Sequence, residues 1–359
     1  MPAVRYMQKT KPIRIVMAVT NDLVTDRRVA RHCAALREAG YEVTAVGRMR
    51  HMLFSRGAGF YAEYNVRLLL RLLTMRADIV WANDTDTLPA CYVVARLKGC
   101  RLVMDQHELF PEVPELVGRE RVKRVWEWFE RHLMPKADVL FTVCQSIADY
   151  YKEKYGVKMT VVRNISGAWK VERGEQADEK RAYFTLLYQG CVNKGRGVDW
   201  AIDALEWLDD CRLVVAGGGD LLEQMKAHAT SKPWADRISF TGRLKPEELM
   251  QLTAKADVGL VMLEDLGLSY HYALPNRIGD FVAAGVPMVV SDLPEMAAVI
   301  RRFGVGEIID GTGAKSLAEA VKKVLAKEWK ENDFDKARKD MDWKKEKQIL
   351  IEPFKLLNL

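Results

Sequence analysis

The segment 190–197 combines glycines and a cation in a spacing that suits phosphate binding. It reads GCVNKGRG and stands between a strand-like apolar run and a helix-like stretch. Glycines let backbone amides approach a phosphate, and Arg196 can add a bidentate contact. The triphosphate P-loop is excluded, because Arg196 and Gly197 follow Gly195 where that motif needs a lysine and a hydroxyl. The segment predicts a diphosphate-binding loop, with an ordinary glycine turn as the alternative.

A second polar cluster lies in the segment 270–292, which reads YHYALPNRIGDFVAAGVPMVVSD. Asn276 and Arg277 stand near the expected start of a helix, where amides lack a helical partner and can face a ligand. Asp280, one turn later, can accept hydrogen bonds from ribose hydroxyls. The alternative is a helix start that carries a solvated charge pair.

A third cluster is the segment 103–112, VMDQHELFPE, where a strand ends in polar residues. His107 follows the strand end and stands between Asp105 and Glu108. Neighbouring carboxylates can set the orientation and the pKa of a histidine, so we single out His107 as a site residue. A histidine with a purely structural role is the alternative.

Two further motifs are less specific. The acidic segment 83–86, NDTD, has a spacing that can hold a divalent ion, but we expect Asp86 to cap the helix that follows. No other set of His, Cys and carboxylate residues has metal-ligand spacing, so we predict no metal site. The turn 216–220, AGGGD, looks like a dinucleotide fingerprint, but Leu222 takes the place of its third glycine, which disfavours a dehydrogenase.

Short apolar runs alternate with amphipathic stretches along the whole chain. Helix-like stretches cover about 25–39, the region through 94, 122–133 and 148–155, and this alternation is typical of parallel sheets with helices on both faces. We expect an α/β protein with a first domain over 1–165, a linker over 166–182, a second domain over 183–340, and a helix over 341–359 that returns to the first domain. The expected strands are IRIVMAV, YEVTAVG, ADIVWAN, CRLVMD, ADVLFTV and MTVVRN in the first domain, and FTLLYQG, CRLVVAG, RISFTG, ADVGLVML, VPMVVSD and VGEIID in the second.

Composition restricts the class of protein. Charged residues make up 29% and hydrophobic residues 49%, which is ordinary for a globular chain. The six cysteines lack CxxC spacing, as in reduced cytosolic proteins. No apolar run approaches the ~20 residues of a membrane span, and the basic start lacks an apolar signal region, so we expect a cytoplasmic protein.

Charge is concentrated in the first part of the chain. Residues 1–165 hold 27 Lys and Arg against 18 Asp and Glu, whereas the remainder holds 28 against 31. A basic surface can serve nucleic acid, an anionic membrane or solubility, but no helix-turn-helix, zinc or RNP-type motif supports nucleic acid. The segment 48–76 places six arginines among aromatic residues and leucines, which suits peripheral contact with an anionic membrane. An amphipathic helix with an apolar core face is the alternative.

Taken in order, these segments resemble the family 4 retaining glycosyltransferases. The most specific parts are RVARHCAALREAGYEVTAVGR, DQHELFPE and ALPNRIGDFVAAGVPMVVSDLPEM. The resemblance covers nearly the whole chain and implies two facing Rossmann-like domains, the GT-B fold, with the donor site in the second. It further implies transfer of a sugar from a nucleotide diphosphate sugar to a glycan or a lipid-linked glycan, with retention of configuration and no cofactor.

The resemblance also assigns residues. Gly190 opens the phosphate loop, Arg196 contacts the donor diphosphate, and Asp280 replaces the second glutamate of the family's E-x7-E motif. Tyr272 stands where the first glutamate is expected, and Cys191 where many relatives carry an arginine. The implied catalytic residues are His107, Glu108 and Asp26, and the implied donor-binding residues are Gly190, Arg196, Gly219, Gly242, Arg243, Leu244, Tyr272, Leu274, Asn276, Arg277 and Asp280.

Two alternatives share this build. A nucleotide-sugar 2-epimerase has the same two-domain architecture but needs acid and base carboxylates beside the sugar. A catalytically silent subunit that binds a nucleotide sugar is suggested by Tyr272 and Cys191, which stand at positions where the family commonly has charged residues.

Overall fold

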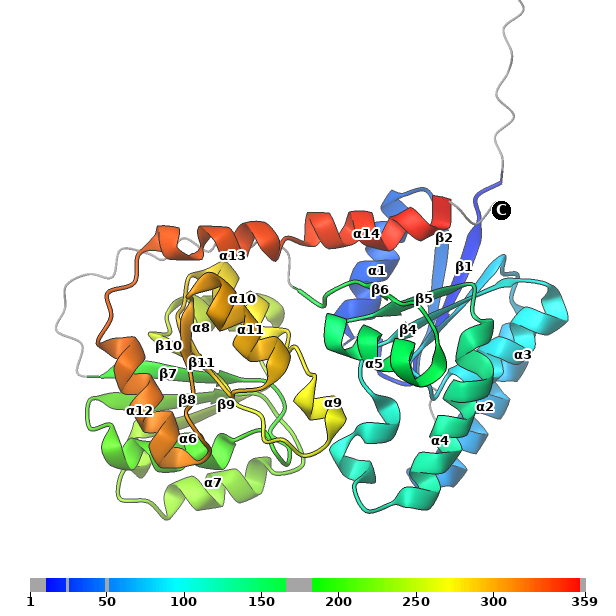
Figure 1. Cartoon of the computed structure of the whole chain (residues 1–359). Coiled ribbons are helices and arrows are strands. Elements are labelled where there is room, and N and C mark those ends of the chain that lie inside the picture. Colours follow the sequence, from blue (N-terminus) through cyan, green and yellow to red (C-terminus); the bar gives the residue numbers. More distant parts are fainter. Residues whose placement is uncertain (1–10, 24–25, 49–51, 166–182, 356–359) are drawn as a thin grey trace, which may run out of the picture.

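The chain folds into two domains, each built on one parallel sheet with helices on both faces (Figure 1). The structure, a computed structural model, describes residues 11–23, 26–48, 52–165 and 183–355. The predicted α/β fold class is confirmed. The predicted linker 166–182 lies outside the described residues.

The first sheet has the strand order β2-β1-β3-β4-β5-β6. All six strands pair in parallel, at the positions that the sequence predicts. Its strands are β1 (Arg14–Ala18), β2 (Glu42–Val46), β3 (Ile79–Asn83), β4 (Arg101–Gln106), β5 (Val139–Thr142) and β6 (Thr160–Val161). Its helices are α1 (Arg27–Glu38), α2 (Gly57–Thr74), α3 (Leu88–Lys98), η1 (Phe110–Glu112), η2 (Pro114–Leu116), α4 (Glu120–Leu133), η3 (Met134–Lys136) and α5 (Gln145–Tyr155).

The second sheet has the order β12-β11-β10-β7-β8-β9, again entirely parallel. Its strands are β7 (Phe184–Gln189), β8 (Cys211–Ala216), β9 (Ile238–Gly242), β10 (Val258–Val261), β11 (Met288–Val290) and β12 (Gly306–Ile308). Its helices are α6 (Val198–Ala204), η4 (Leu205–Trp207), α7 (Leu222–Thr230), η5 (Ala235–Arg237), α8 (Pro246–Ala254), α9 (Leu268–His271), α10 (Arg277–Ala284), α11 (Pro294–Phe303) and α12 (Ala314–Leu325). The chain ends with η6 (Glu331–Phe334), α13 (Asp335–Asp340) and α14 (Trp343–Lys355).

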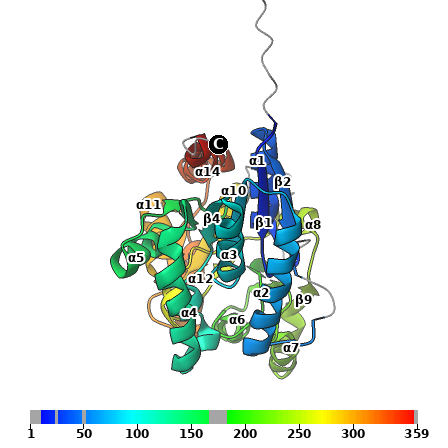
Figure 2. The ribbon, with the colours of Figure 1, turned by 90° about the vertical axis from the view of Figure 1, so that its right-hand side faces the viewer.

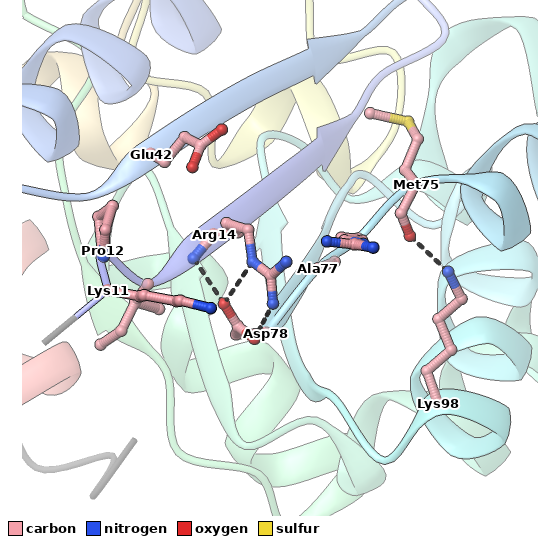
Figure 3. Close-up of a pocket in the computed structure, with 10 residues that line it drawn as sticks. Lys11, Pro12, Arg14, Glu42, Met75, Ala77, Asp78 and Lys98 are labelled. Carbon is pink, nitrogen blue, oxygen red and sulfur yellow. Dashed lines mark hydrogen bonds and ion pairs between the residues drawn. The ribbon is translucent and has the colours of Figure 1, made fainter.

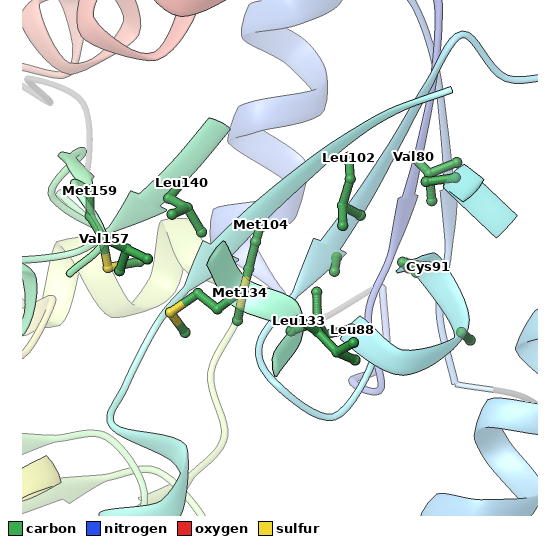
Figure 4. Packing of buried hydrophobic residues seen from close by; sticks show 14 of the residues in the cluster. Val80, Leu88, Cys91, Leu102, Met104, Leu133, Met134, Leu140, Val157 and Met159 are labelled. Carbon is green, nitrogen blue, oxygen red and sulfur yellow. The ribbon is translucent and has the colours of Figure 1, made fainter. Parts of the chain in front are cut away.

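The strands are buried on both faces, as their continuous apolar runs predict. In β1, Val16 and Ala18 face one cluster of the first domain, whereas Ile15 and Met17 face the other. Figure 4 shows the first of these clusters, in which Met104 of β4 packs near residues of α3 and η3. Side chains of successive strand residues point to opposite faces, so each sheet supports two layers of helices.

The last two helices connect the domains. α13 contacts α10 of the second domain and α14 contacts α1 of the first, and Figure 2 shows α14 beside the first sheet. Leu350 and Phe354 of α14 are buried in the core of the first domain. Arg163, after β6, donates to the carboxylates of Asp340 and Glu346 at 2.5 and 2.9 Å, which ties the end of the first sheet to both helices.

The sheet orders place the candidate residues. In the first sheet the order reverses between β1 and β3, and in the second between β7 and β10. Ligands of open parallel sheets bind beyond the carboxyl ends of the strands at such reversals. The loops that follow β1, β3 and β7 hold Asp26, Asp84 and Arg196, and Asn276 lies between α9 and α10 in the connection that follows β10, so both reversals carry polar residues from the predicted clusters.

Candidate active site

A cavity of about 510 Å³ lies between the domains. The first domain lines it with the loop after β1, with Arg48 and with His107, and the second domain with Arg243 and Asn276. Four arginines and two aspartates are among its lining residues. The lining is Thr20, Asn21, Asp22, Asp26, Arg27, Arg28, Arg48, His107, Asn164, Arg243 and Asn276. Arg28 is paired with Asp105 in the interior, so Arg27, Arg48 and Arg243 give the cavity a small excess of positive charge over Asp22 and Asp26.

His107 is held between two carboxylates. Its Nε2 lies 3.1 Å from Asp105 Oδ2 and its Nδ1 lies 3.2 Å from Asp84 Oδ2. The backbone N–H of His107 also donates to Asp84 Oδ1 at 2.8 Å. Asp84 has a φ of 61°, a conformation that aspartate adopts more readily than most residues. Both ring nitrogens are thus committed to carboxylates of the protein.

This arrangement fixes the charge of His107. Burial alone would lower the pKa of the imidazole, but the carboxylates of Asp84 and Asp105 raise it to about 10. His107 is therefore an imidazolium at neutral pH, a form that cannot accept a proton. Because the pKa is raised from 6.5, the ion pairs stabilise the fold fully below about pH 6.5, and this stabilisation is lost as the pH rises through 10.

Asp105 connects His107 to the core. Arg28 donates to both carboxylate oxygens of Asp105, at 2.8 and 2.6 Å, and to the Val162 carbonyl at 2.7 Å. Burial alone would raise the pKa of Asp105, but Arg28 and His107 hold it well below its ordinary value. Asp105 therefore stays ionised and keeps the imidazole in place.

Glu108 follows His107 at the end of β4, and its side chain is exposed. Partial desolvation, followed by the charges of Asp84 and Glu115, raises the pKa of the Glu108 carboxyl to about 7, and the charge of Arg196 opposes this rise. The guanidinium of Arg196 lies 4.7 Å from the ring centroid of Tyr270. Its Nε is buried and has no hydrogen-bond partner among the described residues. Glu108 and Arg196 thus influence each other across the two domains, although Arg196 does not line the cavity that holds His107.

The glycine-rich loops of the second domain pack against each other. A Cβ on Gly217 would lie 1.8 Å from the Gly190 carbonyl oxygen, and a Cβ on Gly219 would lie 2.3 Å from Asn193 Oδ1. Gly190 itself has a φ of 136°. These glycines are therefore needed where the loops after β7 and β8 touch, which places Gly219 beneath the predicted phosphate loop.

Arg277 and Asp280 lie under the same loop. The Arg277 guanidinium donates to the carbonyls of Gln189 and Met262 at 2.9 and 3.2 Å. Asp280, only 4% exposed, accepts from Gln189 Nε2 at 3.0 Å. The structure thus brings the two predicted residues to the end of β7, largely buried and already bonded to the protein.

The remaining predicted residues fall into two groups. Asp26 lines the cavity and also caps α1, since its carboxylate accepts from the Val29 N–H at 3.0 Å and from Asn21 at 3.2 Å. Gly242, with a φ of 69°, ends β9 and turns the chain so that Arg243 enters the cavity. A second group lies outside this cavity: Leu244 packs in the second domain, Leu274 contacts the cores of both domains, and Tyr272 packs on the first-domain core and accepts a hydrogen bond from Cys144.

The prediction that Asp86 caps α3 is wrong. The residue at the cap position is Thr87, and Asp86 instead accepts a hydrogen bond from Thr20 at 2.6 Å in a buried site. Asp84 is committed to His107, so the two acids of NDTD serve different contacts. The described residues contain no group of three or more His, Cys, Asp and Glu residues placed to hold a metal ion. Within the same part of the chain, none of the helices combines the length and apolar character that crossing a membrane requires.

A larger hollow, of about 910 Å³, lies at the other end of the first sheet (Figure 3). Arg14 at the start of β1 pairs there with Asp78, just before β3, at 2.8 Å. The amino ends of parallel strands are not where such sheets bind ligands. This hollow is therefore not the candidate active site.

Two doubly wound domains with a cationic cavity between their carboxyl ends define a GT-B fold. Solved structures support it: sucrose-phosphate synthase from Thermosynechococcus elongatus matches with a TM-score of 0.75 at 14% identity, covering 96% of this chain and 99% of that chain. Anabaena HepE in complex with UDP-glucose matches with a TM-score of 0.74 at 13% identity, covering 96% and 100%. The family models agree, since Glycosyltransferase Family 4 matches residues 25–165 and Glycosyl transferases group 1 matches residues 172–341. The chain belongs to the family 4 glycosyltransferases of the GT-B type.

The curated relatives match a smaller part of the chain than the solved structures do. A GDP-mannose-dependent alpha-(1-6)-phosphatidylinositol monomannoside mannosyltransferase of Mycobacterium tuberculosis (strain CDC 1551 / Oshkosh) is 29% identical over 135 residues. The match covers 36% of this chain and 35% of that protein. The chain thus spans about a third of the length of the curated relatives that it matches first.

The sequence did not predict that Asp84 pairs with His107. Removing the charge of Asp84 tests this pair. The substitution Asp84→Asn keeps the shape and tolerates the positive φ, but removes a charge beside the imidazole. We expect the pKa of His107 to fall from about 10 by roughly 1 to 3 units, measured by NMR titration of the imidazole.

The matched control is Glu112→Gln, because the Glu112 carboxylate pairs with Lys123 at 2.6 Å instead of with a histidine. An unchanged His107 titration in Asp84→Asn would contradict the assigned pair.

Proposed function

We propose that this protein transfers a sugar from a nucleotide diphosphate sugar to an acceptor, with retention of anomeric configuration. The observation that carries the proposal is the cavity between the domains, where Arg27, Arg48 and Arg243 line the carboxyl ends of the first sheet and the loops of the second. Such a concentration of positive charge matches a diphosphate leaving group. Family membership supports the same reaction class.

The proposed chemistry needs stabilisation of a departing diphosphate and of an oxocarbenium-like sugar. In the proposal, Arg243, which lines the cavity, and Arg196, whose buried Nε has no hydrogen-bond partner among the described residues, bind the phosphate oxygens. Preorganised cations of this kind contribute on the order of 10²-fold or more to the rate of other enzymes. The charge on the diphosphate is thus balanced by side chains, and the proposal includes no metal cofactor.

Retention follows in the proposal from attack on the leaving-group side. The acceptor hydroxyl attacks the anomeric carbon as the bond to the diphosphate breaks, and the diphosphate accepts its proton. In the proposal His107 lines the donor cavity as part of a charge-balanced network and does not act as a base, because both ring nitrogens are bonded to carboxylates. The anomeric configuration of the product, read by NMR, tests this step and also separates transfer from 2-epimerisation.

The proposed acceptor is a glycan or a lipid-linked glycan. Apolar side chains of the segment 48–76 are exposed, including Leu53 at 82%, Val66 at 58% and Leu70 at 61%, so its outer surface is not purely basic. This supports the proposal of peripheral contact with an anionic membrane. Sedimentation with anionic vesicles that weakens in high salt tests this contact, and absence of binding at low salt would contradict it.

The donor site is tested by thermal unfolding with GDP, UDP, ADP and their sugar conjugates. A ligand at 100 times its dissociation constant stabilises the folded protein by about 2.7 kcal/mol. We expect one nucleoside diphosphate and its sugar to stabilise wild type in this way, and to stabilise Arg196→Ala clearly less. The mannosyltransferase relative is named as GDP-mannose-dependent and the HepE structure contains UDP-glucose, so both bases are tested first.

The matched control is Arg301→Ala, which removes an exposed arginine of the second domain that pairs with Asp292. It should respond to the nucleotide as wild type does. If no nucleotide stabilises wild type, the donor site is wrongly assigned; stabilisation without any transfer product would favour a silent binding subunit.

The raised pKa of Glu108 predicts a pH dependence of donor binding. Its raised pKa of about 7 means that the carboxyl is neutral below pH 7 and negative above it. The Glu108 side chain is exposed, so solvent screens its charge. We therefore expect the affinity for the nucleoside diphosphate to fall modestly, by roughly twofold, between pH 6 and pH 8, measured by calorimetry.

The control is Glu108→Gln, whose side chain cannot ionise at this position. Its pH profile of nucleotide affinity should therefore lack the titration of Glu108. A pH profile of Glu108→Gln that coincides with wild type would show that Glu108 does not act on the donor.

A further inference from the structure

The segment 264–274 joins the predicted phosphate loop to the first domain. It lies between β10 and α10 and contains α9. Figure 1 shows α9 at the edge of the second domain that faces the first domain, and α9 contacts η1 there. The segment therefore lies between the loop that holds Arg196 and the wall of the opposite domain.

The phosphate loop packs directly against this segment. The N–H of Glu264 donates to the Gly195 carbonyl at 2.9 Å. A Cβ on Gly195, which has a φ of 74°, would lie 2.6 Å from Leu266 Cδ1 and 3.2 Å from Tyr270 Cε2. The absence of a side chain at residue 195 thus lets the loop approach the ring of Tyr270.

Tyr270 lies beneath Arg196. The Tyr270 side chain is buried, with 6% exposure, and its hydroxyl donates to the Lys194 carbonyl at 3.4 Å. The Arg196 guanidinium lies 4.7 Å from the ring centroid, within the ~6 Å at which the face of a ring attracts a cation. The ring thus gives the guanidinium a defined place.

This contact leaves Arg196 with hydrogen-bonding capacity for a ligand. Its Nε is buried and has no hydrogen-bond partner among the described residues, and within the same residues Arg196 forms no ion pair. The charge of Glu108 acts on it from the first domain without such a pair. A ring attracts a guanidinium through its face, so most of the five N–H donors of the group stay available for phosphate oxygens.

The first domain holds the other side of the segment. The Cys144 thiol donates to the Tyr272 carbonyl at 3.2 Å, and the Tyr272 side chain packs on the first-domain core. At Gly267, which has a φ of 113°, a Cβ would lie 3.0 Å from the carbonyl oxygen of Glu112. The residues that precede and follow Tyr270 in this segment are therefore fixed by the opposite domain.

We infer that Tyr270 is a positioning residue, whose ring holds the Arg196 guanidinium where the donor diphosphate binds. The inference rests on the proposed function, because it takes Arg196 as a ligand of the diphosphate. Tyr270 acts through Arg196 and not on the nucleotide itself. Because the first domain holds the segment that carries the ring, the place of this cation depends on the contact between the domains as well as on the phosphate loop.

The experiment is a double-mutant cycle in titration calorimetry with the full chain, with GDP, UDP and ADP as the probes. Tyr270→Leu removes the ring, so the nucleotide that binds wild type should lose roughly threefold to tenfold of its affinity, the range of cation–π contacts. In the Arg196→Ala background the same substitution should change the affinity by less than about twofold, because the cation that the ring positions is absent.

Two further variants separate the ring from the fold. Tyr270→Phe is the conservative variant, which keeps the ring and should recover most of the affinity that Tyr270→Leu loses. The matched control is Phe303→Leu, which removes a ring 4.8 Å from another guanidinium of the second domain, that of Arg302, and should bind nucleotide as wild type does. Thermal unfolding without ligand checks that each variant is folded, and Tyr270→Met replaces Tyr270→Leu if that variant unfolds.

Three results would overturn the inference: Tyr270→Leu binds as wild type does, Tyr270→Phe loses as much affinity as Tyr270→Leu, or Tyr270→Leu loses the same factor with and without Arg196. The third result would show that the ring only supports the fold. In each case wild type still binds nucleotide, and the proposed function stands. If none of the three nucleotides binds wild type, the donor site itself is wrongly assigned and the inference fails with it.

Discussion

The buried ion pair between Arg28 and Asp105 is the interaction on which the site depends. Both side chains are almost fully inaccessible, at 3% and 0% exposure, and removing two charges from water costs several kcal/mol each. That cost is offset only when the remaining donors and acceptors are also bonded. Here Arg28 reaches the Val162 carbonyl and Asp105 receives His107, so α1 and the ends of β4 and β6 are held together by one network. The position of the imidazolium follows from that network.

The second domain combines close backbone packing with buried charge. The carbonyl of Gly190 occupies the space of a side chain at Gly217, so the loops after β7 and β8 form one unit. Arg277 lies beneath it, with its guanidinium 4.8 Å from the Tyr188 ring centroid and bonded to two carbonyls. A buried cation in such a place raises the local positive potential without touching the ligand. The structure thus separates cations that support the loop from those, such as Arg243, that open into the cavity.

The sequence could predict the strands because their side chains are buried on both faces and leave continuous apolar runs. It could also single out His107 and Arg196 as candidates, because polar residues that follow a predicted strand can be read from the sequence. It could not predict that Asp84, 23 positions before His107, pairs with the imidazole. That contact depends on the pairing of β3 with β4, which places Asn83 opposite Asp105. The cap assigned to Asp86 failed for a related reason: Thr20, from another loop, competes for the carboxylate. The hydrogen-bond partners of Asp84 and Asp86 are thus set by residues distant in sequence, which local spacing cannot predict.

The bonding of His107 constrains how transfer can outcompete hydrolysis. His107 lines the cavity between the domains, but both of its ring nitrogens are bonded to carboxylates, so it cannot activate a water molecule as a base. Residues of both domains line this cavity, so its access to water depends on how the domains pack. Water exclusion strengthens electrostatic contacts and suppresses hydrolysis of a reactive sugar. A site that lacks a base at His107 and is enclosed by two domains would therefore favour attack by a bound acceptor over attack by water.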